Sequence, residues 1–372
     1  MAINNPGNYH DEIMRENILK LREVMTTLPS FCKTFFRGIE EYTSSRTRLS
    51  YAYDIRLFFE FLKENNPSLK SKEITDFDLS VLDMVKREDI EEYLEYLTLY
   101  EKNEKEITND ERGKARKLSS LRSMYKYFYT SELISTNPPS LVQTPKIHQK
   151  EIIRLEPDEV AALLDMVEDG EKLTKSQLKY HNKTKVRDVA LLTLLLGTGI
   201  RVSECVGLDI KNVDFKTNGI LIRRKGGKEA TVYFGDEVRD ALMDYMEIRS
   251  RIIPESGSED ALFLSLQNKR LCVRSVENLV KKYAGNVTNL KKITPHKLRS
   301  TYGTSLYRET GDIYLVADVL GHKDVNTTRK HYAAIEDERR RSAANVVKLR
   351  EGGGKLGKNG ELRHPDDDQS PE

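Results

Sequence analysis

Residues 194–205 read Leu194-Leu-Leu-Gly-Thr-Gly-Ile-Arg-Val-Ser-Glu-Cys205, which is the end of an apolar helix, a turn with two glycines and the start of a second helix. Arg201 stands in the predicted first turn of that second helix. A cation there opposes the helix dipole unless an anion binds at the same place, where free backbone N–H groups and the guanidinium both hold it. Glu204, one turn on, is placed to orient the guanidinium. A surface arginine paired with Glu204 explains this segment equally well.

The same unusual placement of cations recurs at residues 294–299, Thr-Pro-His-Lys-Leu-Arg. Thr294 is a natural N-cap and Pro295 suits the first helical position, so basic side chains again crowd the positive end of a helix. His296 and Arg299 are three residues apart and are predicted to share one helix face, a spacing suited to gripping one phosphate. A buried or solvated histidine is the ordinary alternative.

A β-hairpin is predicted between these two helix starts. The runs 219–224 and 229–234 are strand-like, and Lys225-Gly-Gly-Lys228 joins them. Lys225 lies at the tip, where a long ammonium group can reach a ligand. A lysine chosen for solubility at a turn is the simpler explanation of that residue taken alone.

Two further residues follow the second helix start. His322 comes directly after Gly321, where a helix is predicted to end, and Tyr332 follows ten residues later. Tyrosine is usually a packing residue and the chain has 18 of them, so Tyr332 is not identifiable in isolation.

Taken together, these segments resemble the tyrosine recombinase (phage integrase) family, whose ordered signature is an Arg, a hairpin Lys, His-x-x-Arg, a Gly-His and a Tyr close behind it. The resemblance covers about residues 40–345. In the N-terminal part, at 76–82 and 117–123, it is most similar to the Xer-type single recombinases of Firmicutes. It assigns the catalytic positions to Arg201, Lys225, His296, Arg299, His322 and Tyr332.

The resemblance also implies the fold. We expect a mainly α protein, with an N-terminal helical (SAM-like) core-binding bundle and a mostly α catalytic domain that contains a small antiparallel β-sheet. A chain of 372 residues is long enough for two cores. Prolines between 136 and 150 favour a linker there. The predicted boundaries are 1–140 for the bundle, 141–152 for the linker, 153–350 for the catalytic domain and 351–372 for a disordered acidic tail.

The net charge of the chain is less informative about function than the positions of its basic residues. Residues 351–372 hold three basic and six acidic side chains, so their net charge of −3 leaves +5 for residues 1–350. That surplus is consistent with a polyanionic partner but does not require one.

One predicted helix of the bundle, about residues 111–130, has an apolar side and a basic side with small residues, which would let its backbone approach a phosphate backbone. A second basic segment, 43–48, leads into the helix that contains Tyr51. An ordinary solvated surface is the alternative for both segments. The residues predicted to contact DNA are Arg46, Arg48, Arg112, Arg116, Ser119, Ser120 and Ser123.

By resemblance, Tyr332 attacks a phosphodiester and forms a 3′-phosphotyrosyl link. Arg201 and Arg299 clamp the phosphate, Lys225 acts as general acid, and the two histidines manage protons and orientation. Replacing either arginine is expected to slow cleavage with little effect on folding.

No cofactor is expected. The sequence has no Gly-x-x-x-x-Gly-Lys-Ser/Thr loop and no carboxylate cluster for Mg²⁺, and the covalent link conserves bond energy without ATP. The expected partners are double-stranded DNA at a specific site and three further copies, in a homotetramer on DNA docked through a C-terminal helix at 335–349. No membrane segment is predicted. Three scattered cysteines and the lack of a signal pattern predict a cytoplasmic protein.

Two other functions stay open at this level. A DNA-binding protein could keep this fold without catalysis, although the complete residue set argues against that. A type IB topoisomerase shares the chemistry but acts as a monomer, and the predicted helix at 335–349 favours a recombinase. Chromosome dimer resolution and mobile-element integration are not separable from these residues.

If this mechanism holds, DNA cleavage persists in excess EDTA and without any nucleotide, because no step uses a metal or ATP. Cleavage of a site-bearing duplex is measured with and without EDTA. Activity that is lost on chelation and restored by Mg²⁺ would overturn the mechanism.

Overall fold

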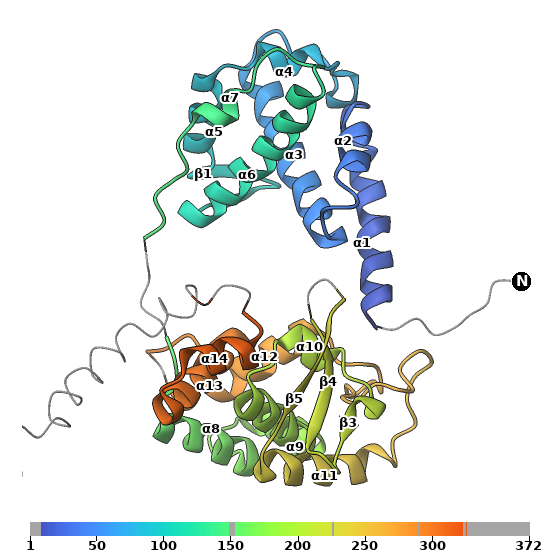
Figure 1. The fold of residues 1–372 in the computed structure, drawn as a ribbon, viewed down its shortest axis with the longest axis vertical. Helices are drawn as coiled ribbons and strands as arrows, with labels where there is room; N and C mark the ends of the chain where they lie inside the picture. Colours follow the sequence, from blue (N-terminus) through green and yellow to red (C-terminus); the bar gives the residue numbers. More distant parts are fainter. Residues whose placement is uncertain (1–8, 149–152, 225–226, 289, 323–324, 326–372) are drawn as a thin grey trace, which may run out of the picture. The chain divides into compact units, whose positions relative to one another are not determined.

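The structure is a computed structural model that describes residues 9–148, 153–224, 227–288, 290–322 and 325 (Figure 1). The chain divides into two compact units, residues 1–151 and 152–372. This division falls inside the segment 141–152 that the sequence suggests as a linker. The predicted tail and the predicted C-terminal helix at 335–349 lie outside the described residues.

Unit 1 is a helical bundle, as the sequence predicts. Apolar residues at helical spacing pack inward, and the core is rich in interlocking aromatic rings, such as Phe58 against Tyr93 at 5.1 Å between ring centroids. The helices are α1 (Tyr9–Met25), α2 (Cys32–Gly38), α3 (Ser45–Asn65), α4 (Ser80–Met84), α5 (Arg87–Tyr96), α6 (Glu111–Thr130) and α7 (Pro138–Leu141), with a 3-10 turn, η1 (Ile74–Asp76). The basic helix predicted at about 111–130 is α6.

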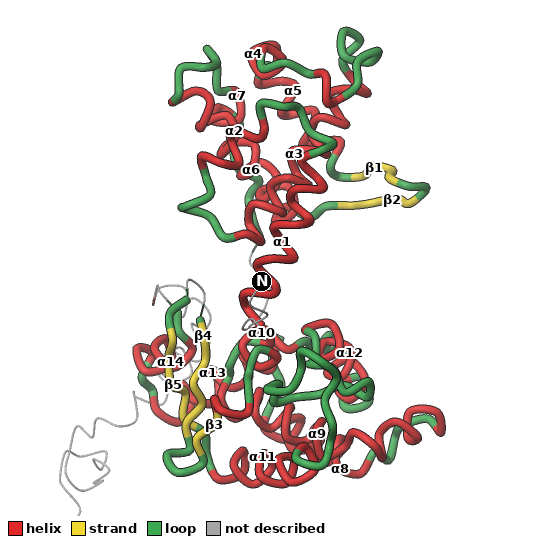
Figure 2. Tube along the Cα trace, turned by 90° about the vertical axis from the view of Figure 1, so that its right-hand side faces the viewer, coloured by secondary structure: helices red, strands yellow, loops and turns green. Residues whose placement is uncertain are grey.

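Unit 1 also has a two-stranded hairpin that the sequence analysis missed. Strands β1 (Leu99–Lys102) and β2 (Lys105–Thr108) pair antiparallel and project from the bundle (Figure 2). Their turn residues, Asn103 and Glu104, have φ of 52° and 58°. These positions usually carry glycine, and its absence hides the turn from pattern reasoning.

A buried carboxylate joins α3 to α6. Asp54 accepts two hydrogen bonds from the Arg116 guanidinium, at 2.5 and 2.7 Å, and one from the Ser120 hydroxyl at 3.3 Å. Burial raises the pKa of Asp54, whereas Arg116 and Lys117 act to lower it. Removing one partner of such a pair leaves the others unsatisfied, so this contact fixes how α6 sits on α3.

Unit 2 is built around a long central helix, α9 (Lys175–Thr198), whose C-terminal half is almost entirely buried. It packs against α8 (Pro157–Asp169), α11 (Asp236–Arg249) and α13 (Pro295–Thr310). The remaining helices are α10 (Val202–Val206), α12 (Val273–Ala284) and α14 (Ile313–Leu320), with a 3-10 turn, η2 (Ile210–Asn212).

A three-stranded antiparallel sheet completes unit 2, in the order β3 (Val213–Asp214), β4 (Gly219–Arg223) and β5 (Glu229–Tyr233). The last ladder pair before the hairpin tip is Arg223 with Glu229. The mainly α fold with a small antiparallel sheet, and the strands predicted at 219–224 and 229–234, are thus confirmed. Within the described residues, no helix has the length and apolar character that a membrane crossing needs.

Replacing Asp54 with Ala is expected to lower the free energy of unfolding of unit 1 by about 2–4 kcal/mol, because Arg116 and Ser120 lose their shared acceptor. Hydrogen exchange of α3 and α6 amides in the full chain measures the change. Glu92→Ala, at an exposed position of α5, is the matched control and should leave exchange unaltered. Equal protection in both variants would show that the Asp54 contact does not hold α6.

Candidate active site

Arg201 is held by Glu204. It is the N-cap of α10, so it precedes the first turn in which the sequence analysis placed it. The Glu204 carboxylate accepts from the Arg201 backbone N–H at 2.7 Å and from its Nη1 at 2.8 Å. Glu204 is buried, whereas 38% of the Arg201 side chain is exposed. The carboxylate therefore fixes one side of the guanidinium and leaves another side open to a ligand.

Arg299 lies inside unit 2 and joins two helix ends. Its Nη1 donates to the Gly199 carbonyl at 2.5 Å, and its Nη2 donates to the Leu320 carbonyl. Gly199 is the C-cap of α9 and Leu320 is the last residue of α14. Helix C-termini present unsatisfied carbonyls with partial negative charge, so a guanidinium is well matched to a place between two of them.

The glycine at the end of α9 makes this approach possible. Gly199 has φ +62°, and a Cβ on it would lie 2.4 Å from Cδ1 of Tyr302 on α13 and 3.0 Å from Cδ2 of Leu320. A larger residue would be strained by its backbone and would push both helices away. Arg201 is two residues after Gly199, so the close packing at Gly199 places Arg201 near the junction of α9, α13 and α14.

His322 is set by the end of α14. Gly321 has φ +61°, its N–H donates to the Asp318 carbonyl at 2.8 Å, and the His322 N–H donates to the Ala317 carbonyl at 2.8 Å. This pair of bonds is a Schellman motif, which closes a helix and fixes the direction of the next residue. His322 therefore stands two residues from the carbonyl that Arg299 binds.

The two members of the His-x-x-Arg motif have different environments. His296 is exposed in the first turn of α13, whereas Arg299 is 5% exposed. The predicted N-cap Thr294 is in place, but its side chain makes no capping hydrogen bond. The structure therefore does not present this pair as a symmetric grip on one phosphate: His296 is accessible, and Arg299 spends two donors on the protein backbone.

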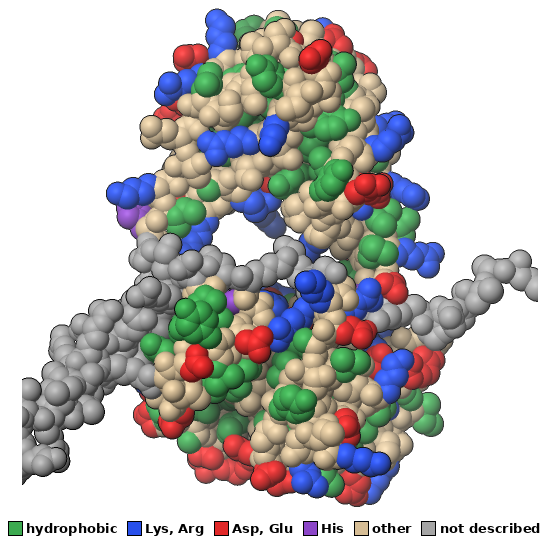
Figure 3. All heavy atoms as spheres, viewed as in Figure 1, with side chains coloured by type: hydrophobic (Ala, Val, Ile, Leu, Met, Phe, Trp, Pro, Cys, Tyr) green, Lys and Arg blue, Asp and Glu red, His purple; other side chains and the backbone are tan. Residues whose placement is uncertain are grey.

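Four of the six predicted catalytic residues lie in the part of unit 2 that the structure describes. The contacts of Arg299 bring the segments of Arg201 and His322 to its own helix. Lys225 and Tyr332 lie outside the described residues. Lys and Arg side chains gather at the end of unit 2 near the tips of β4 and β5, and Asp and Glu side chains are prominent around α8 (Figure 3).

Three other tyrosines of unit 2, Tyr302, Tyr307 and Tyr314, are poorly placed as nucleophiles. Burial raises the pKa of the Tyr302 phenol, which opposes formation of its phenolate, and Tyr307 is 5% exposed. Tyr314 is exposed, but it lies in the first turn of α14, a helix length from His322 at the other end.

The predicted DNA contacts in unit 1 need two corrections. Ser120 is fully buried because it packs toward Asp54, so its placement on the exposed side of α6 is wrong. Arg48 is 7% exposed and pairs with Glu40 at 2.5 Å, so it is also not on the surface. The remaining five residues keep partly or fully exposed side chains: Arg46, Arg112, Arg116, Ser119 and Ser123.

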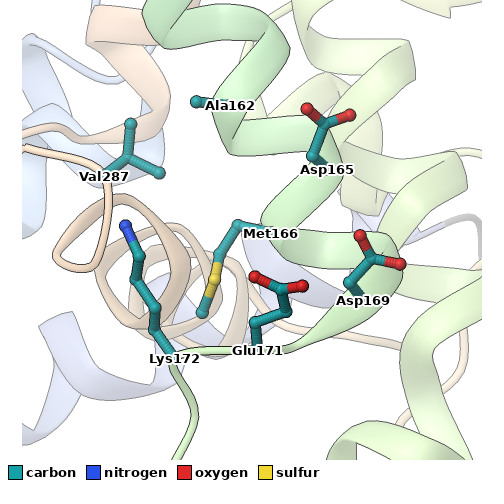
Figure 4. Close-up of a pocket in the computed structure, with 7 residues that line it drawn as sticks. All are labelled: Ala162, Asp165, Met166, Asp169, Glu171, Lys172 and Val287. Carbon is teal, nitrogen blue, oxygen red and sulfur yellow. The ribbon is translucent and has the colours of Figure 1, made fainter.

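A pocket of about 200 Å³ lies elsewhere in unit 2, beside the end of α8 (Figure 4). Asp165, Asp169 and Glu171 line it, together with Lys172 and three apolar side chains. Three carboxylates would repel a phosphate, and no predicted catalytic residue lines this pocket. Among the described residues, no group of three or more His, Cys, Asp or Glu side chains is arranged to hold a metal ion.

A helical bundle, a mostly α unit with a small sheet, and helix ends that bring the segments of Arg201, Arg299 and His322 together fit the class expected from the sequence, enzymes that break and rejoin DNA. The chain belongs to the phage integrase family, whose model matches residues 153–339. It is 35% identical over 314 residues to tyrosine recombinase XerC of Caldanaerobacter subterraneus subsp. tengcongensis, covering 81% of each chain. It is 30% identical to tyrosine recombinase XerS of Streptococcus agalactiae, covering 88% of this chain and 98% of the relative.

Solved structures share the fold. The XerH recombinase in a post-cleavage complex with palindromic difH has a TM-score of 0.62 and 20% identity, covering 89% of both chains. The Tn1549 transposon integrase with circular intermediate DNA has a TM-score of 0.60 and 19% identity, covering 86% of this chain and 100% of that one. The family match and these relatives confirm the resemblance found in the sequence, and the chain is a tyrosine recombinase.

The burial of Arg299 changes the expectation that its replacement has little effect on folding. Arg201→Ala should slow cleavage by roughly two to three orders of magnitude, as for removal of one transition-state donor. It should also lower the melting temperature, because the buried Glu204 carboxylate loses its guanidinium partner. Arg299→Ala should slow cleavage as much and also lower the melting temperature, because two buried carbonyls lose their donor. Single-turnover cleavage and thermal unfolding measure both effects. A melting temperature of Arg299→Ala equal to that of the unmodified chain would contradict a structural role for Arg299.

Proposed function

We propose that this chain is a site-specific DNA recombinase that cleaves and rejoins strands with Tyr332 as nucleophile. One observation carries the proposal: the Arg299 guanidinium bonds to carbonyls two residues from Arg201 and two residues from His322. Among the described residues, the segments of Arg201, Arg299 and His322 therefore meet at one place, as a shared phosphate would require.

In the proposed reaction the Tyr332 hydroxyl oxygen attacks the phosphorus of a DNA phosphodiester, and its proton passes to one of the two histidines, His296 or His322. The bond from phosphorus to the 5′-oxygen breaks. The products are a 3′-phosphotyrosyl link and a free 5′-hydroxyl, which takes its proton from Lys225. A 5′-hydroxyl from a second strand reverses these steps and rejoins the DNA. The number of phosphoester bonds is unchanged, so no ATP is consumed.

The other residues stabilise charge in this proposal. The exposed part of the Arg201 guanidinium neutralises a non-bridging oxygen, and Glu204 keeps it oriented without any rearrangement during the reaction. His296 is exposed on the first turn of α13, from which it can hydrogen-bond the same phosphate. Arg299 contributes positive charge from its buried position and fixes the ends of α9 and α14.

The proposed partner is double-stranded DNA at a specific site. Relatives with this fold are described in complexes with DNA, such as XerH with difH and a λ integrase dimer with a core site. In unit 1, Arg112 and Ser119 of α6 and Arg46 of α3 are the exposed candidates for contact with the duplex. Arg116 contacts phosphate only with the part of its side chain that Asp54 leaves open, because 50% of that side chain is exposed.

We propose a homotetramer on DNA, assembled through residues 335–349, and a location in the cytoplasm, where bacterial DNA lies. The match to XerS over nearly the whole of both chains supports a Xer-type role, such as resolution of chromosome dimers. Mobile-element integration or excision uses the same chemistry and is the alternative.

Replacing Tyr332 with Phe is expected to preserve DNA binding and abolish covalent attachment, because only the hydroxyl oxygen is removed. The enzyme is incubated with a nicked suicide substrate and separated by denaturing electrophoresis, with binding measured in parallel. Tyr314→Phe is the matched control and should form the adduct normally. An adduct that survives in the Tyr332 variant would assign the nucleophile to another tyrosine.

A further inference from the structure

Arg224 connects the hairpin tip to the end of α14. It follows the last residue of β4, and its side chain crosses to the helix: Nη2 donates to the Val319 carbonyl at 2.9 Å, and Nη1 lies 3.4 Å from the Asp318 carbonyl. These carbonyls belong to the last turn of α14, where partial negative charge favours a cation. A side chain from the residue after β4 therefore caps a helix that begins 89 positions later in the sequence.

The backbone of Arg224 also closes the hairpin. Its N–H donates to the Lys228 carbonyl at 2.7 Å, and its carbonyl accepts from the Gly227 N–H at 3.1 Å. The regular ladder has already ended at Arg223. Arg224 thus closes the base of the hairpin through its backbone and joins that base to α14 through its side chain.

The guanidinium of Arg224 packs against Gly321. A Cβ on Gly321 would lie 2.4 Å from Nη1 and 2.6 Å from Cζ of Arg224. The φ of +61° favours glycine at position 321, and a side chain there would also displace the guanidinium from the end of α14. Arg224 Nε is buried without a hydrogen-bond partner among the described residues, an unfavourable feature that the helix-end contacts must offset.

Both neighbours of this contact carry proposed catalytic roles. Lys225 follows Arg224, and His322 follows Gly321. We propose that Arg224 is a positioning residue: by packing against Gly321 and the end of α14, it fixes the base of the hairpin turn from which Lys225 would act as general acid. This inference rests on the proposed function, in which Lys225 is the general acid.

A role of Arg224 in proton delivery can be separated from a role in phosphate binding or folding with a modified substrate. A suicide substrate whose bridging 5′-oxygen is replaced by sulfur releases a thiolate, which leaves without a proton from the enzyme. A defect in proton delivery disappears on this DNA, whereas a defect in phosphate binding or in folding persists. Single-turnover cleavage of ordinary and sulfur-substituted DNA is compared at saturating protein for Arg224→Ala, Lys225→Ala and Arg201→Ala. Arg251→Ala, at an exposed pair far along the chain, is the control.

On ordinary DNA we expect Arg224→Ala to reduce cleavage roughly 10- to 100-fold, as for a displaced general acid, with DNA affinity unchanged. On sulfur-substituted DNA it should cleave within about threefold of the unmodified enzyme, as Lys225→Ala should, whereas Arg201→Ala stays slow. The double variant of Arg224 and Lys225 should be no slower than Lys225→Ala, because both act through one proton. Arg224→Lys, which keeps the charge with fewer directed donors, should be intermediate and covers the case in which the alanine variant fails to fold.

Three results would overturn the proposal. Arg224→Ala and Arg224→Lys could cleave ordinary DNA at the unmodified rate. Their defect could persist on sulfur-substituted DNA while that of Lys225→Ala disappears, which would leave the role of Lys225 intact and make Arg224 merely structural. A defect of Lys225→Ala that also persists would remove Lys225 as the general acid and, with it, the reason for positioning it.

Discussion

The buried guanidinium of Arg299 is the contact on which the arrangement of unit 2 depends. It donates to the carbonyl of Gly199 at the end of α9 and to that of Leu320 at the end of α14. Each carbonyl is one that its own helix cannot satisfy, and a guanidinium is the side chain that offers several donors in fixed directions. Losing this bridge would leave two buried acceptors unpaired at the place where three helices meet.

The helix ends at this junction explain why glycine appears twice. Gly199 and Gly321 both have positive φ, and each has a neighbour where a Cβ would be. At Gly199 the neighbour is the ring of Tyr302, which lets α13 approach α9. At Gly321 it is the guanidinium of Arg224, which lets the hairpin approach α14. The partly exposed residues Arg201 and His322 each stand one or two positions beyond such a glycine, so backbone geometry places them.

In unit 1, buried hydrogen bonds to a charged group likewise join two helices, α3 and α6. Asp54 receives Arg116 and Ser120 from α6, and this buried contact orients the helix that was expected to face DNA. Helical periodicity correctly separated the apolar residues Leu118, Leu121 and Phe128 from Arg112 and Ser119. It failed at Ser120 because a small hydroxyl can be buried once it finds an acceptor, and the acceptor comes from α3. Arg48 was misjudged for the same reason, since its partner Glu40 precedes the helix.

By itself the sequence determined the class of fold, the positions of the main helices, the strands β4 and β5, and the ordered signature that places the chain in its family. These follow from local pattern: apolar spacing, a glycine-rich turn, and cations at two helix starts. Only the tertiary structure decided which of the signature arginines is buried, that Thr294 caps without its side chain, and that Arg224 joins the hairpin to α14. These depend on which carbonyls and carboxylates distant segments bring within hydrogen-bond reach, and no local pattern in a single sequence records that pairing.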